Sequence, residues 1–305
     1  MNMRHLIAAL PPNFFLTLVD VGSAGGLHRR WQNLRPLLSA ILFDPRETAA
    51  NGLIGRGQVR VYPVALGPEA GEADLHVTAL ANMSSFLRPD PDAFARYRKK
   101  GADARVVGTE TVPVETLDAL ANADGFKPHV IKVDTQGSEL MVLAGAESSL
   151  QSTVLAEIEV SFFERYVGQP LFADVEGWMK ARGFELIELH RLKRYRAANS
   201  LGIRRPLVGE GQRSGRVAYG DAIFVKQEAR ILDAARQDSG LAILRAFVAL
   251  IAYGKADHAA ALLDRGRGLI PPKACQGAAR ALAALNRRWV IRELGGVIQR
   301  ARGRG

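Results

Sequence analysis

Residues 18–26 have the sequence LVDVGSAGG, and this stretch decides the fold that we expect for the chain. A short apolar run, typical of a buried strand, reaches an acid, Asp20, and then a turn of small residues. Small residues let the backbone approach a ligand closely, because no side chain blocks it. We therefore predict a ligand-binding loop after a first strand, with Gly22, Ser23 and Gly26 as candidate contacts. A helix predicted over residues 27–38 would direct its N-terminal N–H groups at the same ligand.

The acid in this loop indicates the charge of the ligand. A dinucleotide-binding loop would have the pattern G-x-G-x-x-G with no acid before the first glycine. Asp20 would repel a pyrophosphate, and it suits a ligand with a positive charge, such as the amino group of a methionine moiety. Asp44 closes the second predicted strand, where a carboxylate can accept both hydroxyls of a ribose. The plain alternative for Asp44 is a turn-forming Asp-Pro pair.

The rest of the chain alternates short β-rich runs with longer helical stretches as far as Lys226. This alternation is typical of a mostly parallel sheet covered by helices. The predicted strands are residues 16–21, 40–43, 59–65, 75–78, 130–133, 154–160, 184–189 and 221–225. The predicted helices are residues 27–38, 91–100, 114–121, 138–144 and 173–182. Beyond Lys226 only helical spacing remains, so we predict an α/β domain over residues 1–226 and a helical extension over residues 227–305.

A third acid ends another buried strand, in the sequence IKVDTQGSEL at residues 131–140. Asp134 comes directly after the predicted strand 130–133, and Gly137 allows a tight exit into the next helix. In an open α/β sheet, ligands bind outside the carboxyl ends of the strands. We therefore expect Asp20, Asp44 and Asp134 to converge on one edge of the sheet.

Over residues 16–226 the chain resembles the FkbM family of methyltransferases. The most specific match is the string Ile-Lys-x-Asp-x-x-Gly-x-Glu at residues 131–139, followed by Leu-x-Gly-Ala. Further matches are the loop at 20–26, PVALG at 63–67, Ser84-Ser85, VPVETLD at 112–118 and EIE at 157–159. The resemblance implies a class I, Rossmann-like methyltransferase fold, a doubly wound and mostly parallel sheet with an antiparallel terminal strand. Residues 201–215 and the helical extension match nothing in the family.

The resemblance also implies S-adenosylmethionine as cofactor and O-methylation, often of sugar hydroxyls in polysaccharides, glycolipids or secondary metabolites. We accordingly expect Asp20, Asp44 and Asp134 to bind the cofactor. The loop residues Gly22, Ser23 and Gly26 and the residue Ala65 of the PVALG motif are expected to join them.

An alcohol must lose its proton during methylation, which requires a general base or a metal ion. Asp134 is our first candidate for the base. Glu157 and Glu159 are the next candidates, because residues two apart on a strand share a face; equally, they could be ordinary acids facing arginines. A magnesium ion between Asp134 and one glutamate would acidify the alcohol, but we assign no residue as a metal ligand. His190 more closely fits a solvated loop, beside its basic neighbours.

The formal net charge of +10 favours an anionic partner, such as a phosphorylated substrate or a membrane surface, although solvated basic faces without a partner are the better explanation. The basic clusters do not show the alternation of aromatic and basic residues typical of a groove that stacks single-stranded nucleic acid, so we expect no nucleic acid. The single cysteine, Cys275, excludes an intrachain disulfide and fits a cytoplasmic protein. We expect no export signal and no transmembrane helix, and the oligomeric state stays open.

Two rival functions remain. A nicotinamide-dependent oxidoreductase lacks support, since the chain has neither G-x-G-x-x-G after the first strand nor a Tyr-x-x-x-Lys pair. The second rival is a catalytically inactive, methyltransferase-like scaffold that uses the helical extension to bind a partner. The presence of three acids at strand ends argues against it.

Overall fold

A computed structural model of the chain describes residues 4–12, 14–22, 26–46, 50–54, 57–97, 100–203 and 214–286. Three parts of the predictions lie outside these residues: the loop contact Ser23, most of the segment 201–215, and the end of the helical extension.

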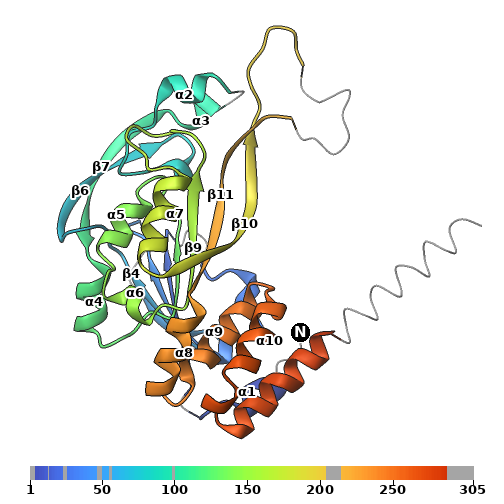
Figure 1. Cartoon of the computed structure of the whole chain (residues 1–305). Helices are drawn as coiled ribbons and strands as arrows, with labels where there is room; N and C mark the ends of the chain where they lie inside the picture. The colour runs from blue at the N-terminus through green and yellow to red at the C-terminus, as the bar shows by residue number, and fades with distance from the viewer. Residues whose placement is uncertain are drawn as a thin grey trace, which may run out of the picture.

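The centre of the molecule is an eight-stranded sheet with the order β10-β11-β9-β8-β1-β2-β4-β3 (Figure 1). Its strands are β1 (Leu16–Val21), β2 (Leu38–Phe43), β3 (Ala50–Ile54), β4 (Gly57–Tyr62), β8 (Val130–Val133), β9 (Leu155–Ser161), β10 (Phe184–Tyr195) and β11 (Arg216–Lys226). The five strands from β9 to β4 pair in parallel, whereas β11 joins β9 antiparallel and β10 joins β11 antiparallel. The predicted mostly parallel, doubly wound sheet with an antiparallel end is confirmed.

Strand β1 lies where the order of the strands reverses. Its parallel neighbours are β2 on one side and β8 on the other, and the chain reaches them in opposite directions across the sheet. Such a point is a topological switch point, and ligands of open α/β sheets bind outside the strand ends there. All six residues of β1 are buried, as expected for a strand covered on both faces.

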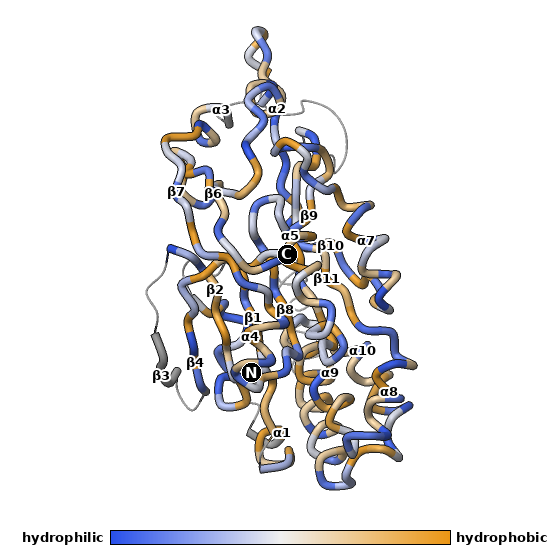
Figure 2. Tube along the Cα trace, turned by 90° about the vertical axis from the view of Figure 1, so that its left-hand side faces the viewer, coloured by the Kyte–Doolittle hydropathy of each residue, from blue (hydrophilic) through white to orange (hydrophobic). Residues whose placement is uncertain are grey.

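Helices cover the two faces of the sheet. On one face Val19, Ile131 and Ile158 belong to a core shared with helices α5 and α7. On the other face, Leu18 and Val130 belong to a core shared with α9 and α10. The helices are α1 (Arg4–Ala9), α4 (Leu117–Ala123), α5 (Glu139–Ala144), α6 (Ser149–Ser152), α7 (Phe172–Ala181), α8 (Glu228–Gln237), α9 (Leu241–Ala252) and α10 (Ala256–Arg265). Figure 2 shows how hydrophobic residues concentrate in the central strands and in α9.

The helical segment after β11 is therefore a layer on the sheet. Helix α9 is apolar around most of its circumference, which fits a helix buried between other elements. Figure 1 shows α1 and α8 to α10 gathered at the lower end of the molecule. Among the described residues, no helix has the length and apolar character needed to cross a membrane.

A small second sheet has the order β5-β7-β6, from β5 (Ala65–Leu66), β6 (Gly71–Thr78) and β7 (Val106–Glu115). It lies at the upper end in Figure 1 together with α2 (Pro91–Ala95) and α3 (Lys100–Asp103). The sequence patterns did not predict β7, because Pro113 interrupts it. Strand β5 pairs with β7 only at Val114 and Glu115, so Pro113 lies where that side of β7 has no neighbouring strand.

The helix predicted over residues 27–38 is wrong. The segment forms two 3-10 turns, η1 (Arg29–Trp31) and η2 (Arg35–Leu37), before β2 begins at Leu38. Pro36 has no N–H to donate and cannot continue an α-helix, which leaves room only for short turns. The apolar spacing reflects the burial of Trp31, Leu34 and Leu37 against the helical layer. As a consequence, no α-helix begins among the described residues 26–37 after the glycine loop.

Candidate functional site

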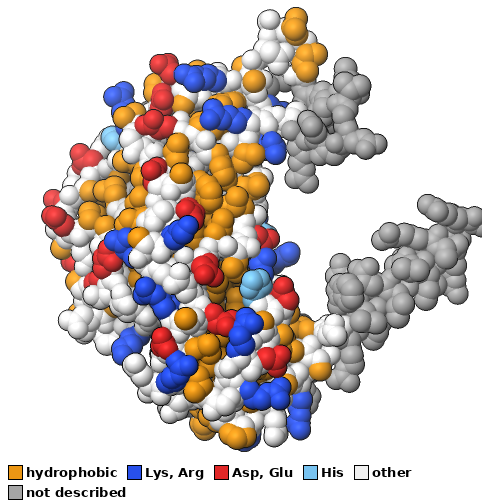
Figure 3. Space-filling model, viewed as in Figure 1, with side chains coloured by type: hydrophobic (Ala, Val, Ile, Leu, Met, Phe, Trp, Pro, Cys, Tyr) orange, Lys and Arg blue, Asp and Glu red, His pale blue; other side chains and the backbone are white. Residues whose placement is uncertain are grey.

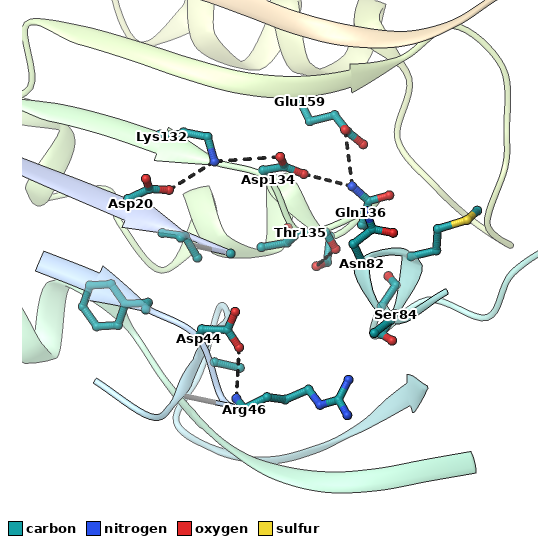
Figure 4. A pocket seen from close by; sticks show the side chains of 18 of the residues that line it. Asp20, Asp44, Arg46, Asn82, Ser84, Lys132, Asp134, Thr135, Gln136 and Glu159 are labelled. Atoms are coloured by element: carbon teal, nitrogen blue, oxygen red, sulfur yellow. Dashed lines mark hydrogen bonds and ion pairs between the residues drawn. The ribbon is translucent and has the colours of Figure 1, made fainter. Parts of the chain in front are cut away.

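A cavity of about 810 Å³ opens at the carboxyl ends of β1, β2 and β8. Its volume lies in the range of roughly 300–1,000 Å³ found for small-molecule sites. The predicted cofactor contacts that line it are Asp20, Gly22, Gly26, Asp44, Ala65 and Asp134. The three strand-end acids expected to converge do so, and Figure 4 shows them around the same space.

Gly22 lies where the first loop packs against the end of β8. Its N–H donates to the carbonyl of Phe43, while the Asp134 N–H donates to the carbonyl of Val21. Gly22 has φ +77°, and a Cβ there would lie 2.1 Å from the backbone oxygen of Asp134. The absence of a side chain at this position therefore allows the three strand ends to meet.

Gly22→Ala is expected to destabilise the protein more than Gly26→Ala. Gly26 has a similar φ of +79°, but no atom of the described residues lies within 4 Å of the position of a Cβ. Both variants incur the cost of a left-handed alanine, about 1–2 kcal/mol, and only Gly22→Ala adds a collision with backbone. Urea unfolding measures the difference in the free energy of unfolding. Equal losses in the two variants would contradict the close packing at Gly22.

Lys132 lies between two of the acids, and the sequence analysis missed it. Its Nζ is 3.1 Å from Asp20 Oδ1 and 3.8 Å from Asp134 Oδ2. Burial raises the pKa of Asp20, an effect that Lys132 opposes. Burial alone would lower the pKa of Lys132, but the carboxylates of Asp20 and Asp134 raise it. The sequence does contain a signal for Lys132, because a lysine two residues before Asp134 in a buried strand must project toward the same face as that acid.

The loop after β8 holds Asp134 in place. Glu139 Oε1 accepts the N–H groups of Thr135 and Gly137, each at 3.0 Å, and so fixes the loop. Gln136 has φ +57°, and its Nε2 donates to Asp134 Oδ1 at 2.9 Å and to Glu159 Oε2 at 3.3 Å. The glutamate and the glycine of the Asp-x-x-Gly-x-Glu string thus shape the loop, while Gln136 orients the acid.

Glu159 lines the cavity but has strong partners of its own. Its Oε1 is 2.7 Å from a guanidinium nitrogen of Arg165, and both side chains are buried. Burial and the neighbouring Asp134 raise the pKa of Glu159 to about 8, an effect that Arg165 opposes. Both oxygens of Glu159 therefore already accept hydrogen bonds, from Arg165 and from Gln136.

The described residues do not fit a magnesium ion between Asp134 and a glutamate. The Gln136 amide nitrogen, a hydrogen-bond donor, already bridges Asp134 and Glu159. Within the described ranges, no group of three or more His, Cys, Asp or Glu side chains could hold a metal ion. A hard cation needs oxygen ligands, which this arrangement does not bring together.

Glu157 does not line the cavity, although it shares a face of β9 with Glu159. Its carboxylate lies 2.8 Å from Arg30, 2.6 Å from Arg191 and 2.6 Å from the Tyr253 hydroxyl. Burial would raise the pKa of Glu157, but Arg30, the Tyr253 hydroxyl and Arg191 together lower it. Glu157 thus joins the sheet to η1, to β10 and to the end of α9.

The far end of the cavity is formed by the β10–β11 hairpin and by η3 (Ala81–Met83). Arg191 Nε is 2.8 Å from Asp221 Oδ2, and its φ is +50° where β10 has an irregular register. Burial and Glu157 raise the pKa of Asp221 to about 6, while Arg191 lowers it. Lys193, Tyr219 and Asn82 line this end as well. The sequence offered no motif for these residues.

The other predicted residues are placed as follows. Asp44 lines the cavity, and its Oδ1 accepts the N–H of Arg46 at 3.0 Å. Ser84 lines it too, and its hydroxyl accepts the N–H of Thr78. His190 is exposed beside Glu188 on β10. On the face shown in Figure 3, basic side chains are interspersed with acidic ones, so the net charge forms no continuous basic surface there.

The comparisons with known proteins agree with this geometry. The family model of the methyltransferase FkbM domain matches residues 40–186. The chain is similar to the 2-O-methyltransferase NoeI of Sinorhizobium fredii, with 26% identity over 164 residues. That match covers 50% of this chain and 66% of the relative, just under two thirds of its length. No solved structure matches the chain. The chain is therefore similar to the FkbM family of methyltransferases over residues 40–186, just under half of its length.

Proposed function

We propose that the protein is an S-adenosylmethionine-dependent O-methyltransferase that acts on a hydroxyl, that of a sugar in a polysaccharide, glycolipid or secondary metabolite. The observation that carries the proposal is the meeting of Asp20, Asp44 and Asp134 in one cavity at the switch point of an FkbM-type sheet. The relative's name, a 2-O-methyltransferase, supports oxygen as the methylated atom.

The end of the cavity near β1 and β2 suits the cofactor. Asp44 can accept the two ribose hydroxyls, and Phe43 and Ala65 offer apolar surface beside it. Asp20 and the glycines of the first loop are available to the methionine part. When bound, the cofactor supplies an electrophilic methyl group, so the protein contributes position and proton removal.

The end near the hairpin suits a compound with several hydroxyls. Asp221, Arg191 and Asn82 supply both acceptors and donors, and Tyr219 supplies an aromatic surface. Figure 4 shows Asp134 between Asp20 on one side and Glu159 and Asn82 on the other. We therefore assign Asp134 as the general base that removes the proton of the acceptor hydroxyl.

Calorimetry with S-adenosylmethionine tests the cofactor part of this proposal. We expect binding by the wild type, and Asp20→Asn and Asp44→Ala to weaken it by about 10-fold or more, because each loses hydrogen bonds made by a charged group. Asp233→Ala on the exposed surface of α8 is the matched control and should bind normally. Wild-type affinity in both cavity variants would refute the placement of the pocket.

Labelled S-adenosylmethionine then tests the chemistry. Incubation with polysaccharide, glycolipid and metabolite extracts is expected to place the label on one class of acceptor as an alkali-stable methyl ether. Binding of the cofactor without transfer to any of these fractions would instead favour the inactive scaffold.

A further inference from the structure

The floor of the cavity carries three charges of alternating sign. Asp20 on β1 and Lys132 on β8 are register partners, and Asp134 follows two residues after Lys132 on the same face. Figure 4 shows the three side chains in a row joined by their ion pairs. Asp20 is 4% exposed, whereas the side chains of Lys132 and Asp134 are 18% and 33% exposed, so the row opens toward the cavity.

This row has the charge pattern that complements the methionine part of S-adenosylmethionine. That part carries an ammonium and a carboxylate on one carbon and a sulfonium further along. Two carboxylates alone would attract the ammonium and the sulfonium but would repel the carboxylate. A cation between them removes this repulsion, and a partly buried cation acts more strongly than an exposed one because the surrounding dielectric is lower.

The other cations that line the cavity are less suited to the role. Arg165 and Arg191 have acidic partners, as Lys132 does, but these are Glu159 for Arg165 and Glu157 and Asp221 for Arg191. Lys132 is paired instead with Asp20 and Asp134, the two acids of the row. Arg46 faces Glu110. Burial and neighbouring arginines lower the pKa of His28. Arg29 and Lys193 are exposed to solvent.

We infer that Lys132 binds the carboxylate of the cofactor's amino-acid part, while Asp20 takes its ammonium and Asp134 faces the sulfonium methyl group. The inference rests on the proposed function and goes beyond it by naming the residue that recognises the carboxylate. The raised pKa of Lys132 keeps the side chain charged at neutral pH, as this role requires.

The affinities of three nucleoside ligands distinguish recognition of the carboxylate by Lys132 from a role in which Lys132 only balances the charge of the two acids. S-adenosylhomocysteine carries the complete amino-acid part, its decarboxylated analogue keeps the amine alone, and methylthioadenosine lacks both groups. In calorimetry, Lys132→Gln is expected to weaken S-adenosylhomocysteine by about 10- to 100-fold, the value of one charged hydrogen bond. The decarboxylated analogue, which is a cation, should bind to Lys132→Gln at least as tightly as to the wild type. The variant lacks the positive charge of Lys132 that repels the amine. Methylthioadenosine should bind unchanged.

Further variants test the assignment of the carboxylate to Lys132 and of the ammonium to Asp20. Lys132→Arg should restore most of the affinity for S-adenosylhomocysteine, and Asp20→Asn should weaken both ligands that carry an amine. Lys193→Gln, an exposed cation of the same cavity, is the matched control and should leave the preference for the carboxylate unchanged.

Several results would overturn the inference. Equally weaker binding of S-adenosylhomocysteine and its decarboxylated analogue to Lys132→Gln would show that Lys132 only balances charge. Loss of the preference for the carboxylate in Lys193→Gln would show that Lys193, and not Lys132, recognises it. If Lys132→Gln does not fold, the wild type alone tests the inference. A preference of less than about 3-fold for S-adenosylhomocysteine over its decarboxylated analogue would contradict the role of Lys132. A wild type that binds none of the three nucleosides would instead refute the proposed function.

Discussion

The Asp134→Asn variant is expected to lose less affinity for S-adenosylmethionine than Asp20→Asn does, and to transfer the methyl group about 100-fold more slowly or worse. Asparagine has nearly the same shape, and its side-chain oxygen can still accept the hydrogen bond from Gln136. An amide cannot take up the proton of an alcohol, so the loss should fall on turnover. Calorimetry gives the affinity, and initial rates with labelled cofactor and the identified acceptor give the turnover.

Glu159→Gln is the companion variant for this experiment. Both oxygens of Glu159 already accept hydrogen bonds from Arg165 and Gln136, so it is poorly placed to accept a proton from the acceptor. We expect a smaller loss of turnover than in Asp134→Asn. Wild-type turnover in Asp134→Asn, together with a large loss in Glu159→Gln, would transfer the role of base to Glu159.

Local patterns were sufficient to predict the parts of the fold that depend on neighbouring residues. Strands β1 and β8 have the predicted bounds, since each is a mainly apolar run that is followed within a few residues by a glycine. The meeting of the three acids followed from the general geometry of parallel sheets. The 27–38 segment was misread because its apolar spacing resembles that of a helix, whereas Pro36 and packing against the helical layer decide its conformation.

The roles of individual charged residues depended on partners that are remote in sequence. Glu157 and Glu159 are alike in type, strand and face, yet one points to the helical layer and the other into the cavity. Arg30 lies 127 residues from Glu157 and Tyr253 lies 96 residues away, so no local pattern could reveal these contacts. The same holds for the pair of Arg191 and Asp221, which register between β10 and β11 creates.

The Glu157→Gln variant is expected to lower the free energy of unfolding by about 3 kcal/mol, the usual cost of breaking a buried ion pair by removing one partner. Its carboxylate is 2% exposed and faces two guanidinium groups, which would lose their counter-charge. Glu185→Gln, the same substitution at an exposed position of β10, should change stability by less than about 0.5 kcal/mol. Urea unfolding at neutral pH measures both.

The dependence on pH gives the prediction a second test. The folded pKa of Glu157 lies below its ordinary value of 4.5, so the unfolded chain takes up a proton first as the pH falls. The stability contributed by the ionised carboxylate is therefore complete above pH 4.5 and disappears as the pH falls through the folded pKa. The difference between the wild type and Glu157→Gln should shrink over that interval. A difference that stays constant into acid would show that shape, and not charge, is responsible.

Tyr253→Phe shows whether the helical layer shares in this stabilisation. It removes one hydroxyl that donates to Glu157 and should cost about 1–2 kcal/mol. In the double variant Glu157→Gln with Tyr253→Phe, the loss should be smaller than the sum of the single losses, because both substitutions remove the same contact. Strict additivity would mean that the two residues act independently. Since Glu157 does not line the cavity, affinity for S-adenosylmethionine should be unchanged in all three variants, which separates support of the fold from participation in the site.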